Sequence, residues 1–215
     1  GGFLGDTRIN FKYLLYNQGK GPGSRVFLGG GLLIPTSATL TESPWTKSNV
    51  MLPNGSEVET YTPHRHFYLS DGAYKMFAEI QFFKKRIKMP VFWGGSFSVE
   101  FPLEESDYGF KPSTRYELSM LALSGPLKNV KTNAPFKISS IGLNMTVGYA
   151  GHSEWNGVST PNSKAMMYIP GLSILFASKA GTFGINIQRG YEEYLQEKVT
   201  DIEETNKVYA ISLSY

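Results

Sequence analysis

Hydrophobic and polar residues alternate strictly along much of the chain, and residues 141–150 show this pattern most clearly. Their apolar members occupy every second position and are Ile141, Leu143, Met145, Val147 and Tyr149. A period of two sustained over ten residues predicts a β-strand with one apolar and one polar side. The same alternation predicts nine strands, at residues 8–17, 25–35, 73–83, 89–103, 114–124, 136–150, 165–177, 182–192 and 206–215.

The predicted strands are long, and the connections between them alternate in length. Each strand spans 10 to 15 residues, against about 5–6 in globular proteins and about 9–11 for a tilted strand that crosses a bilayer. Short connections lie at 18–24, 84–88 and 178–181, and long ones at 36–72, 104–113, 151–164 and 193–205. This alternation is typical of outer-membrane barrels, although 125–135 is longer than the pattern expects. Within the longest loop, Asn54-Gly55-Ser56 predicts the tip of a small hairpin.

Aromatic residues on the apolar sides sort to the two ends of the predicted strands. Those near the long loops are Tyr74, Phe101, Tyr116, Tyr149, Tyr168 and Tyr209. Those near the short turns are Phe82, Trp93, Phe176, Phe183 and Tyr215. Two aromatic belts are typical of a membrane-spanning barrel. A soluble β-barrel binding protein, the alternative, turns its apolar side inward and needs no such sorting.

The composition agrees with an ordered, β-rich protein and excludes several other classes. The 215 residues include 23 Gly, 14 Phe, 13 Tyr and 3 Trp, only 18% are charged, and the net charge is +3. Such a chain is too rich in glycine and aromatic residues for a helical bundle and too apolar for a disordered protein. The absence of cysteine excludes a disulfide scaffold and a thiol nucleophile. A pI near 8.9 with interspersed acids does not indicate nucleic-acid binding, and we recognise neither a transmembrane helix nor a signal peptide.

The polar sides of the predicted strands carry charged and amide residues that we expect to line the interior of a barrel. These pore-lining candidates are Arg8, Lys12, Arg25, Lys75, Glu79, Gln81, Glu100, Arg115, Glu117, Asn144, Asn186 and Gln188. A charge that faces lipid costs about 2–4 kcal/mol near the bilayer midplane, so these side chains belong in a wet lumen or pair across it. A solute pathway is one interpretation, and a closed plug of paired side chains is the other. The inward apolar residues suit a hydrophobic solute better than an ion; they are Phe77, Phe83, Leu121, Leu123, Met167, Ile169 and Leu175.

Candidate catalytic residues are few, and they lie in the predicted long loops. Ser153 or Ser159 beside His152 and Glu154 is the one conceivable hydrolytic grouping. No motif supports it, and we therefore expect a protein that is not an enzyme.

Cation-binding and phosphate-binding signals are equally weak. His64 and His66 have the spacing of a metal site on an extended segment, but a solvated loop is the interpretation we adopt, with no metal and no cofactor. Loop 192–204 has six carboxylates that are suited to share divalent cations with lipopolysaccharide, or simply to be solvated. Gly29-Gly30-Gly31 lacks the context of a phosphate-binding loop and predicts either relief of crowding or a bend at the centre of a strand.

Short motifs give the chain a resemblance to known transporter barrels. The C-terminal Val208-Tyr-Ala-Ile-Ser-Leu-Ser-Tyr215 resembles the terminal β-signal of bacterial outer-membrane proteins. Segment 5–13 followed by 27–36, together with Pro170-Gly-Leu-Ser173, is similar to the meta-pathway phenol-degradation transporter family, which is distantly allied to the fatty-acid transporter barrels. The resemblance implies an all-β antiparallel outer-membrane barrel of about twelve strands that admits small, often hydrophobic solutes.

The number of predicted strands bears on whether they can close into a complete barrel. Nine strands place the two termini at opposite ends, whereas bacterial single-chain barrels have even strand counts with both termini periplasmic. We therefore expect residues 1–215 to form a single barrel domain that lacks its N-terminal strands, unless a strand in 49–62 has been overlooked or one strand has been divided wrongly.

The expected function is that of a passive channel for small, partly hydrophobic solutes in the bacterial outer membrane. Its partners would be the solute, membrane lipid and lipopolysaccharide, and not nucleic acid. The alternative is a structural barrel with a closed lumen, which contacts other envelope proteins through its extracellular loops.

Overall fold

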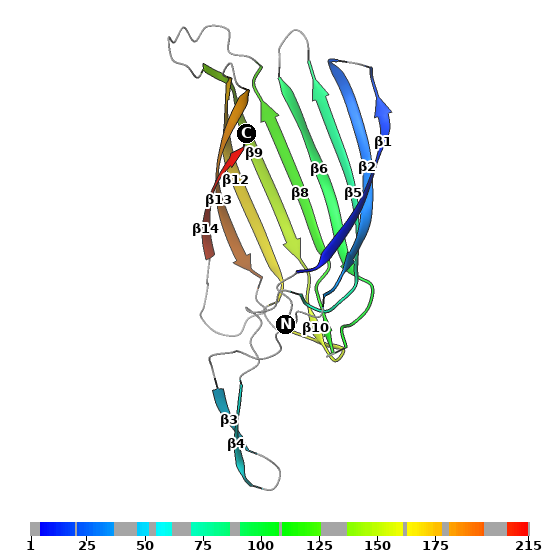
Figure 1. Ribbon diagram of the computed structural model, residues 1–215, viewed down its shortest axis with the longest axis vertical. Coiled ribbons are helices and arrows are strands. Elements are labelled where there is room, and N and C mark those ends of the chain that lie inside the picture. Colours follow the sequence, from blue (N-terminus) through cyan, green and yellow to red (C-terminus); the bar gives the residue numbers. More distant parts are fainter. Residues whose placement is uncertain are drawn as a thin grey trace.

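Nine long strands form one antiparallel sheet in which each strand lies beside its neighbours in the chain (Figure 1). The computed structural model describes residues 5–19, 21–36, 47–51, 55–61, 70–86, 91–107, 109–125, 137–160, 163–177, 181–195 and 206–214. The strands are β1 (Thr7–Asn17), β2 (Gly23–Ile34), β5 (Lys75–Lys85), β6 (Phe92–Pro102), β8 (Arg115–Leu123), β9 (Lys137–Ala150), β12 (Ala165–Ala177), β13 (Thr182–Tyr194) and β14 (Asn206–Ser214). The nine predicted strands are therefore confirmed, and no predicted end is displaced by more than three residues.

The register of the sheet follows from the alternation in the sequence, because paired residues of neighbouring strands share a face. One apolar row crosses five strands through Tyr13, Leu28, Ile80, Phe97 and Leu118. The adjacent row is mostly polar and crosses the same strands through Lys12, Gly29, Glu79, Ser98 and Glu117. The sheet consequently has one apolar and one polar face.

The apolar face is exposed rather than packed into a core. Phe11 is 74% exposed and Leu143 is 67% exposed, although both alternate with polar neighbours in regular strands. The buried hydrophobic residues of the described chain are only Ala73, Phe77, Phe110 and Ala165. A soluble sheet protein would bury its apolar side, so this sheet does not have the core of such a protein.

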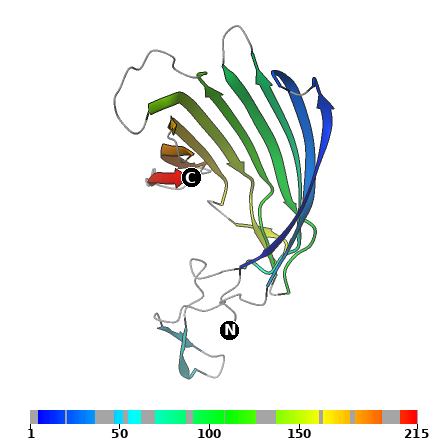
Figure 2. The ribbon, with the colours of Figure 1, turned by 45° about the horizontal axis from the view of Figure 1, so that its top comes forward.

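The sheet is strongly curved (Figure 2). Its polar face is the concave one, because Asp6, Glu117 and Glu192, which come from distant parts of the sheet, line one cavity. Among the described strands, β1 pairs only with β2 and β14 pairs only with β13, so closure into a barrel is not detected. An antiparallel meander of nine strands makes its first and last strands parallel. Direct pairing of β1 with β14 would thus add a parallel pair to an otherwise antiparallel sheet.

The long connections carry small sheets of their own. In the longest, β3 (Lys47–Met51) pairs with β4 (Glu57–Tyr61), and Gly55 beside the turn has a φ of +79°, which confirms the predicted hairpin. This hairpin does not join the nine-stranded sheet. No helix in the described part of the chain is long and apolar enough to span a membrane.

A second small sheet joins two different long loops, 104–113 and 151–164, at the long-loop end of the large sheet. It consists of β7 (Phe110–Lys111), β10 (Glu154–Trp155) and β11 (Val158–Ser159). Asn156 and Gly157 form the turn between β10 and β11 and have φ values of +49° and +75°, as a tight two-residue hairpin requires. The rings of Phe110 and Trp155 lie 4.9 Å apart and pack the two loops together.

Candidate functional site

The register places all twelve pore-lining candidates on the concave face. Lys12, Glu79 and Glu117 share one row across the sheet. Glu100 and Arg115 are direct partners in the next row toward the long loops. The inward apolar residues predicted from the sequence lie on this face as well. Whether the face lines a pore stays a prediction, but its chemistry divides into two regions.

The first region is a cavity of about 660 Å³ at the long-loop end of the concave face. We call it the charged cavity, because six of its lining residues are acidic or basic: Asp6, Asp71, Lys75, Arg115, Glu117 and Glu192. Its other walls include loop residues such as Phe110 and Ser153, both of which are buried. Loops and strands therefore build this cavity together.

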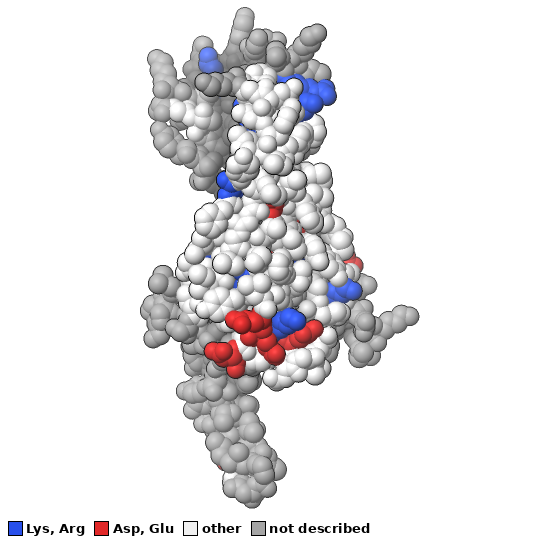
Figure 3. Space-filling model, turned by 90° about the vertical axis from the view of Figure 1, so that its right-hand side faces the viewer, with Lys and Arg blue, Asp and Glu red and all other residues white. Residues whose placement is uncertain are grey.

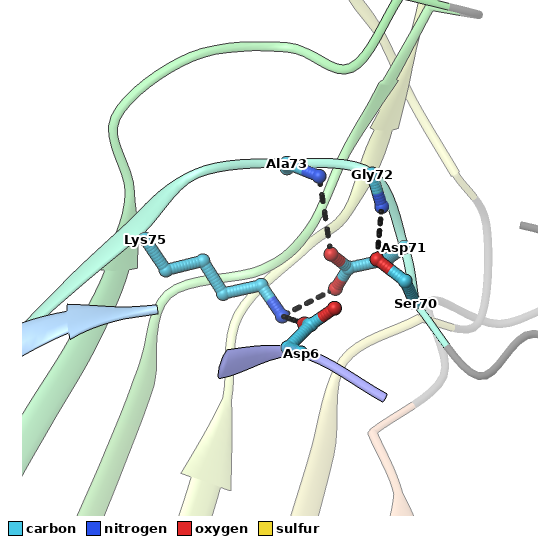
Figure 4. Close-up of polar contacts among 6 residues, drawn as sticks. All are labelled: Asp6, Ser70, Asp71, Gly72, Ala73 and Lys75. Carbon is cyan, nitrogen blue, oxygen red and sulfur yellow. Dashed lines mark hydrogen bonds and ion pairs between the residues drawn. The ribbon is translucent and has the colours of Figure 1, made fainter. Parts of the chain in front are cut away.

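Lys75 is the most buried cation in this region (Figure 4). Its Nζ lies 2.5 Å from Oδ2 of Asp71 and 3.9 Å from Oδ2 of Asp6. Asp71 is itself held in place, because its Oδ1 accepts a hydrogen bond from the backbone N–H of Ala73 at 3.3 Å. A buried ammonium is tolerated only when charge and hydrogen-bond partners offset its desolvation. The segment just before β5 thus supplies the counter-charge that the first residue of β5 requires.

The carboxylates outnumber the ammonium in this cluster. Asp6 reaches Lys75 only at the longer distance, and its Oδ1 is buried with no hydrogen-bond partner among the described residues. Neither Asp6 nor Asp71 was predicted from the sequence, because both lie in irregular segments beside strands, where alternation gives no signal. The nearness of Asp6 to Lys75 follows from the pairing of β1, β2 and β5, whereas Asp71 lies four residues before Lys75 in the chain.

Farther along the same face, charged side chains are paired with neighbours across the strands. Lys12 Nζ lies 3.3 Å from Oε2 of Glu79, and Gln81 donates a hydrogen bond to the other oxygen of that carboxylate. The guanidinium of Arg8 lies 3.9 Å from the centre of the Phe77 ring. Pairs of this kind agree with the expectation of mixed charges that satisfy one another.

Arg25 differs from the other candidates, because the turn between β1 and β2 engages its guanidinium. It donates hydrogen bonds to Oδ1 of Asn17 and to the backbone oxygens of Gly19 and Gly21, each at 3.2 Å. The side chain thereby stabilises the turn.

The second region is a cluster of neutral polar side chains on β9, β12 and β13, which we call the amide cluster. Asn144 Nδ2 donates to Ser173 Oγ and to Asn186 Oδ1, each at 3.0 Å. Gln188 Nε2 donates to Oδ1 of Asn144 at 3.1 Å, and Ser173 Oγ donates to Oδ1 of Asn186 at 3.1 Å. Four side chains from three strands are thus joined by hydrogen bonds.

A glycine makes this cluster possible. Gly171 lies between Asn144 and Gln188 in the same row of the sheet. A Cβ at this position would collide with Oδ1 of Asn144 and lie 2.8 Å from Cγ of Gln188. Only glycine lets the two amides meet across β12. Gly31 acts similarly on β2, since a Cβ there would lie 2.7 Å from Cε1 of Phe77, and the predicted relief of crowding is confirmed at this position.

The amide cluster borders a pocket of about 370 Å³, the amide pocket, and none of its lining residues is charged. Phe83, Leu121 and Leu175 form apolar parts of its wall. No described side chain or backbone group accepts from Nδ2 of Asn186 or donates to Oε1 of Gln188. The pocket therefore offers a donor and an acceptor beside an apolar surface, which suits a small uncharged molecule with both properties.

Comparisons with protein-family models, with curated proteins and with solved structures give no match. Of the expected resemblance, the coarser part is shown by the structure itself, namely an all-β antiparallel sheet with many exposed hydrophobic side chains.

The two regions adjoin each other on β8 and β9. Ser119 Oγ donates to Oε1 of Glu117 at 3.2 Å, and it lies 2.8 Å from Oγ1 of Thr146. Glu117 lines the charged cavity, whereas Ser119 and Thr146 line the amide pocket. A polar strip therefore continues from one region into the other.

The structure describes only some of the remaining candidates from the sequence. His152 is exposed beside the buried Ser153, and Ser159 is exposed on β11. Among the described residues, no three His, Asp or Glu side chains are grouped so that they could hold a metal ion. His64, His66 and the acidic residues of 196–204 lie outside the described part of the chain.

Proposed function

We propose that the protein is an outer-membrane barrel that passes small, uncharged, partly hydrophobic solutes along its concave face. The observation that carries the proposal is the inversion of the sheet, with large apolar side chains exposed on the convex side and hydrogen-bonded polar side chains on the concave side. Exposed apolar area of this extent is costly in water. A lipid environment removes that cost, while the polar face retains water.

The aromatic contacts on the convex face support a membrane setting. At the short-turn end, the rings of Phe82 and Trp93 lie 5.1 Å apart, and those of Phe176 and Phe183 lie 6.3 Å apart. At the long-loop end, Tyr116 and Tyr149 lie 6.1 Å apart. Rings grouped at both ends of an apolar band are what the two interfaces of a bilayer favour.

A membrane barrel requires partners for the outer edges of β1 and β14. Unpaired backbone groups at a lipid-exposed edge cost several kcal/mol each, by order of magnitude. Because β1 and β14 are parallel, an odd number of further strands between them keeps every pair antiparallel. Three further strands would complete the barrel of about twelve strands that the sequence resemblance implies.

The polar strip supports transport in preference to a purely structural barrel. A solute that enters at the long loops first meets the charged cavity and then the neutral amide pocket. Small ions would be attracted or repelled at the first region, and at the second they would lose hydration where no lining side chain carries a compensating charge. Uncharged solutes with apolar surface suit both.

A closed barrel that binds other envelope proteins is the second candidate. The regular structure of the long loops favours this candidate, because β7, β10 and β11 form a small sheet. Structured extracellular loops can present a binding surface.

Two measurements test the proposal. The purified protein in detergent should migrate differently on a gel before and after heating, and in liposomes it should admit a neutral solute such as glucose faster than protein-free vesicles do. A chain that is soluble and monomeric without detergent would contradict the membrane setting. A heat-modifiable barrel that admits no solute would instead favour the closed alternative.

A further inference from the structure

The convex face has an apolar hollow of about 600 Å³ that crosses β5, β6, β8 and β9. Two small residues that point outward, Gly95 and Ala122, are part of its floor. A Cβ on Gly95 would lie 2.6 Å from the backbone oxygen of Ser119, so no side chain can fill the hollow from that position. Larger apolar side chains form its walls, including Phe82, Trp93, Phe97, Met120 and Leu143.

A basic segment lies at the short-turn end of this hollow. Lys84 is the direct cross-strand partner of Trp93 and therefore shares its outward face. Trp93 in turn contacts the Phe82 ring at 5.1 Å. Lys85 and Arg86 follow Lys84 and are exposed, and the sequence from 80 to 99 contains no Asp or Glu. The apolar hollow thus ends at a cation with no carboxylate near it in the sequence.

The opposite end of the molecule has the reverse charge. Glu104, Glu105 and Asp107 are exposed on the connection after β6. On the side shown in Figure 3, acidic side chains gather at the long-loop end beside a few basic ones, and basic side chains without acidic neighbours lie at the opposite end. An anionic ligand that contacts the apolar band is therefore favoured at the short-turn end.

We propose that the hollow binds an acyl chain of an anionic phospholipid and that Lys84 binds its phosphate. This inference rests on the membrane setting proposed above. The stem of a lysine can lie along apolar surface while its ammonium reaches the headgroup layer, and each cation near an anionic surface adds about 1 kcal/mol of attraction. Trp93 lies between the two parts of the site, at the depth where indole rings prefer to lie.

The fluorescence of Trp93 can report on this site. The full chain with Trp45→Phe and Trp155→Phe retains Trp93 as its sole tryptophan and is reconstituted into phosphatidylcholine vesicles. Brominated phosphatidylglycerol, which quenches indole on contact, is then compared with brominated phosphatidylcholine at equal fractions. We expect the anionic lipid to quench Trp93 more strongly, by a relative binding constant of about fivefold.

Matched variants separate the parts of the site. Lys84→Gln should abolish the preference for the anionic lipid, whereas Lys85→Gln, at the next position and on the concave face, should retain it. Ala122→Phe should fill the hollow and reduce quenching by both lipids, whereas Ala78→Phe, also outward but outside the hollow, should not. Equal quenching by the two lipids in the parent chain would overturn the lipid site and leave the membrane setting intact. No quenching by either lipid would overturn both.

Discussion

The charged cavity and the amide pocket lie on the same face of the same sheet, yet they satisfy their polar groups in different ways. In the charged cavity, loop residues bring counter-charges to a buried cation, as Asp71 does for Lys75. In the amide pocket, neutral side chains from neighbouring strands hydrogen-bond to one another across Gly171. The first arrangement depends on irregular segments, and the second depends only on strand register. Sensitivity to substitution should therefore differ between the two regions.

The largest effect is expected from Lys75→Met. It would remove the buried ammonium that contacts the carboxylates of Asp71 and Asp6, whose side chains are only 19% and 16% exposed, and removal of one partner from a buried ion pair costs about 3–5 kcal/mol. The free energy of unfolding, measured by urea titration in detergent, should fall by that order. Lys12→Met is the control, because Lys12 is 46% exposed in its pair with Glu79, and a pair of that kind contributes at most about 1 kcal/mol. Equal losses in the two variants would show that Lys75 is not effectively buried.

The next largest effect is expected where β9 presents one residue to the amide pocket and the next residue to the convex face. Leu143 and Asn144 are adjacent on β9 but point to opposite faces. In a membrane, Leu143→Arg should lower stability by about 2–4 kcal/mol and impair insertion, since an arginine near the midplane would face lipid. Asn144→Arg should insert nearly as well as the parent chain. A membrane-assembly assay that tolerates both variants equally would contradict the assignment of the faces.

Gly171→Ala tests the amide cluster itself. The added Cβ would collide with Asn144 and separate it from Gln188, and overpacking of this kind costs about 1–3 kcal/mol. Gly148→Ala is the matched control on the same face, because its Cβ would meet the flexible end of Met167 at 3.2 Å. Thermal unfolding of both variants gives the comparison. If Gly148→Ala were as destabilising as Gly171→Ala, the close approach of the two amides would not explain the loss of stability.

The contrast between the two regions also explains what could be predicted from the sequence. Asn144, Asn186 and Gln188 were predicted to share a face because each lies in a strand whose alternation sets its direction. Asp6 and Asp71 were not, since alternation says nothing about irregular segments. Ser173 and Gly171 were missed because small neutral residues carry no signal of their own in an alternating pattern. The Asn156-Gly157 pair is typical of a two-residue hairpin, and this signal marks the turn between β10 and β11 in the sequence.

Closure of the sheet lies beyond what alternation can predict. The alternation indicates which side of a strand faces outward, but it does not indicate which distant strand pairs with β1. The two edges are parallel and have no strand partner among the described residues, so the strand count of a closed barrel depends on which further strands pair there.

The smallest effect is expected on selectivity, from one charge placed in each region. Gln188→Glu introduces a carboxylate where no lining residue is charged, and two unit charges about 4 Å apart in water interact by about 1 kcal/mol, which corresponds to roughly a fivefold change in rate. The entry of gluconate into liposomes should slow by that order relative to glucose, a neutral solute of similar size. Glu117→Gln removes one charge from a cavity that retains several others, so its effect on the same ratio should be smaller and opposite in sign. Equal and opposite shifts would mean that solutes sense the two regions alike, whereas a shift only with Gln188→Glu would place the selective step in the amide pocket.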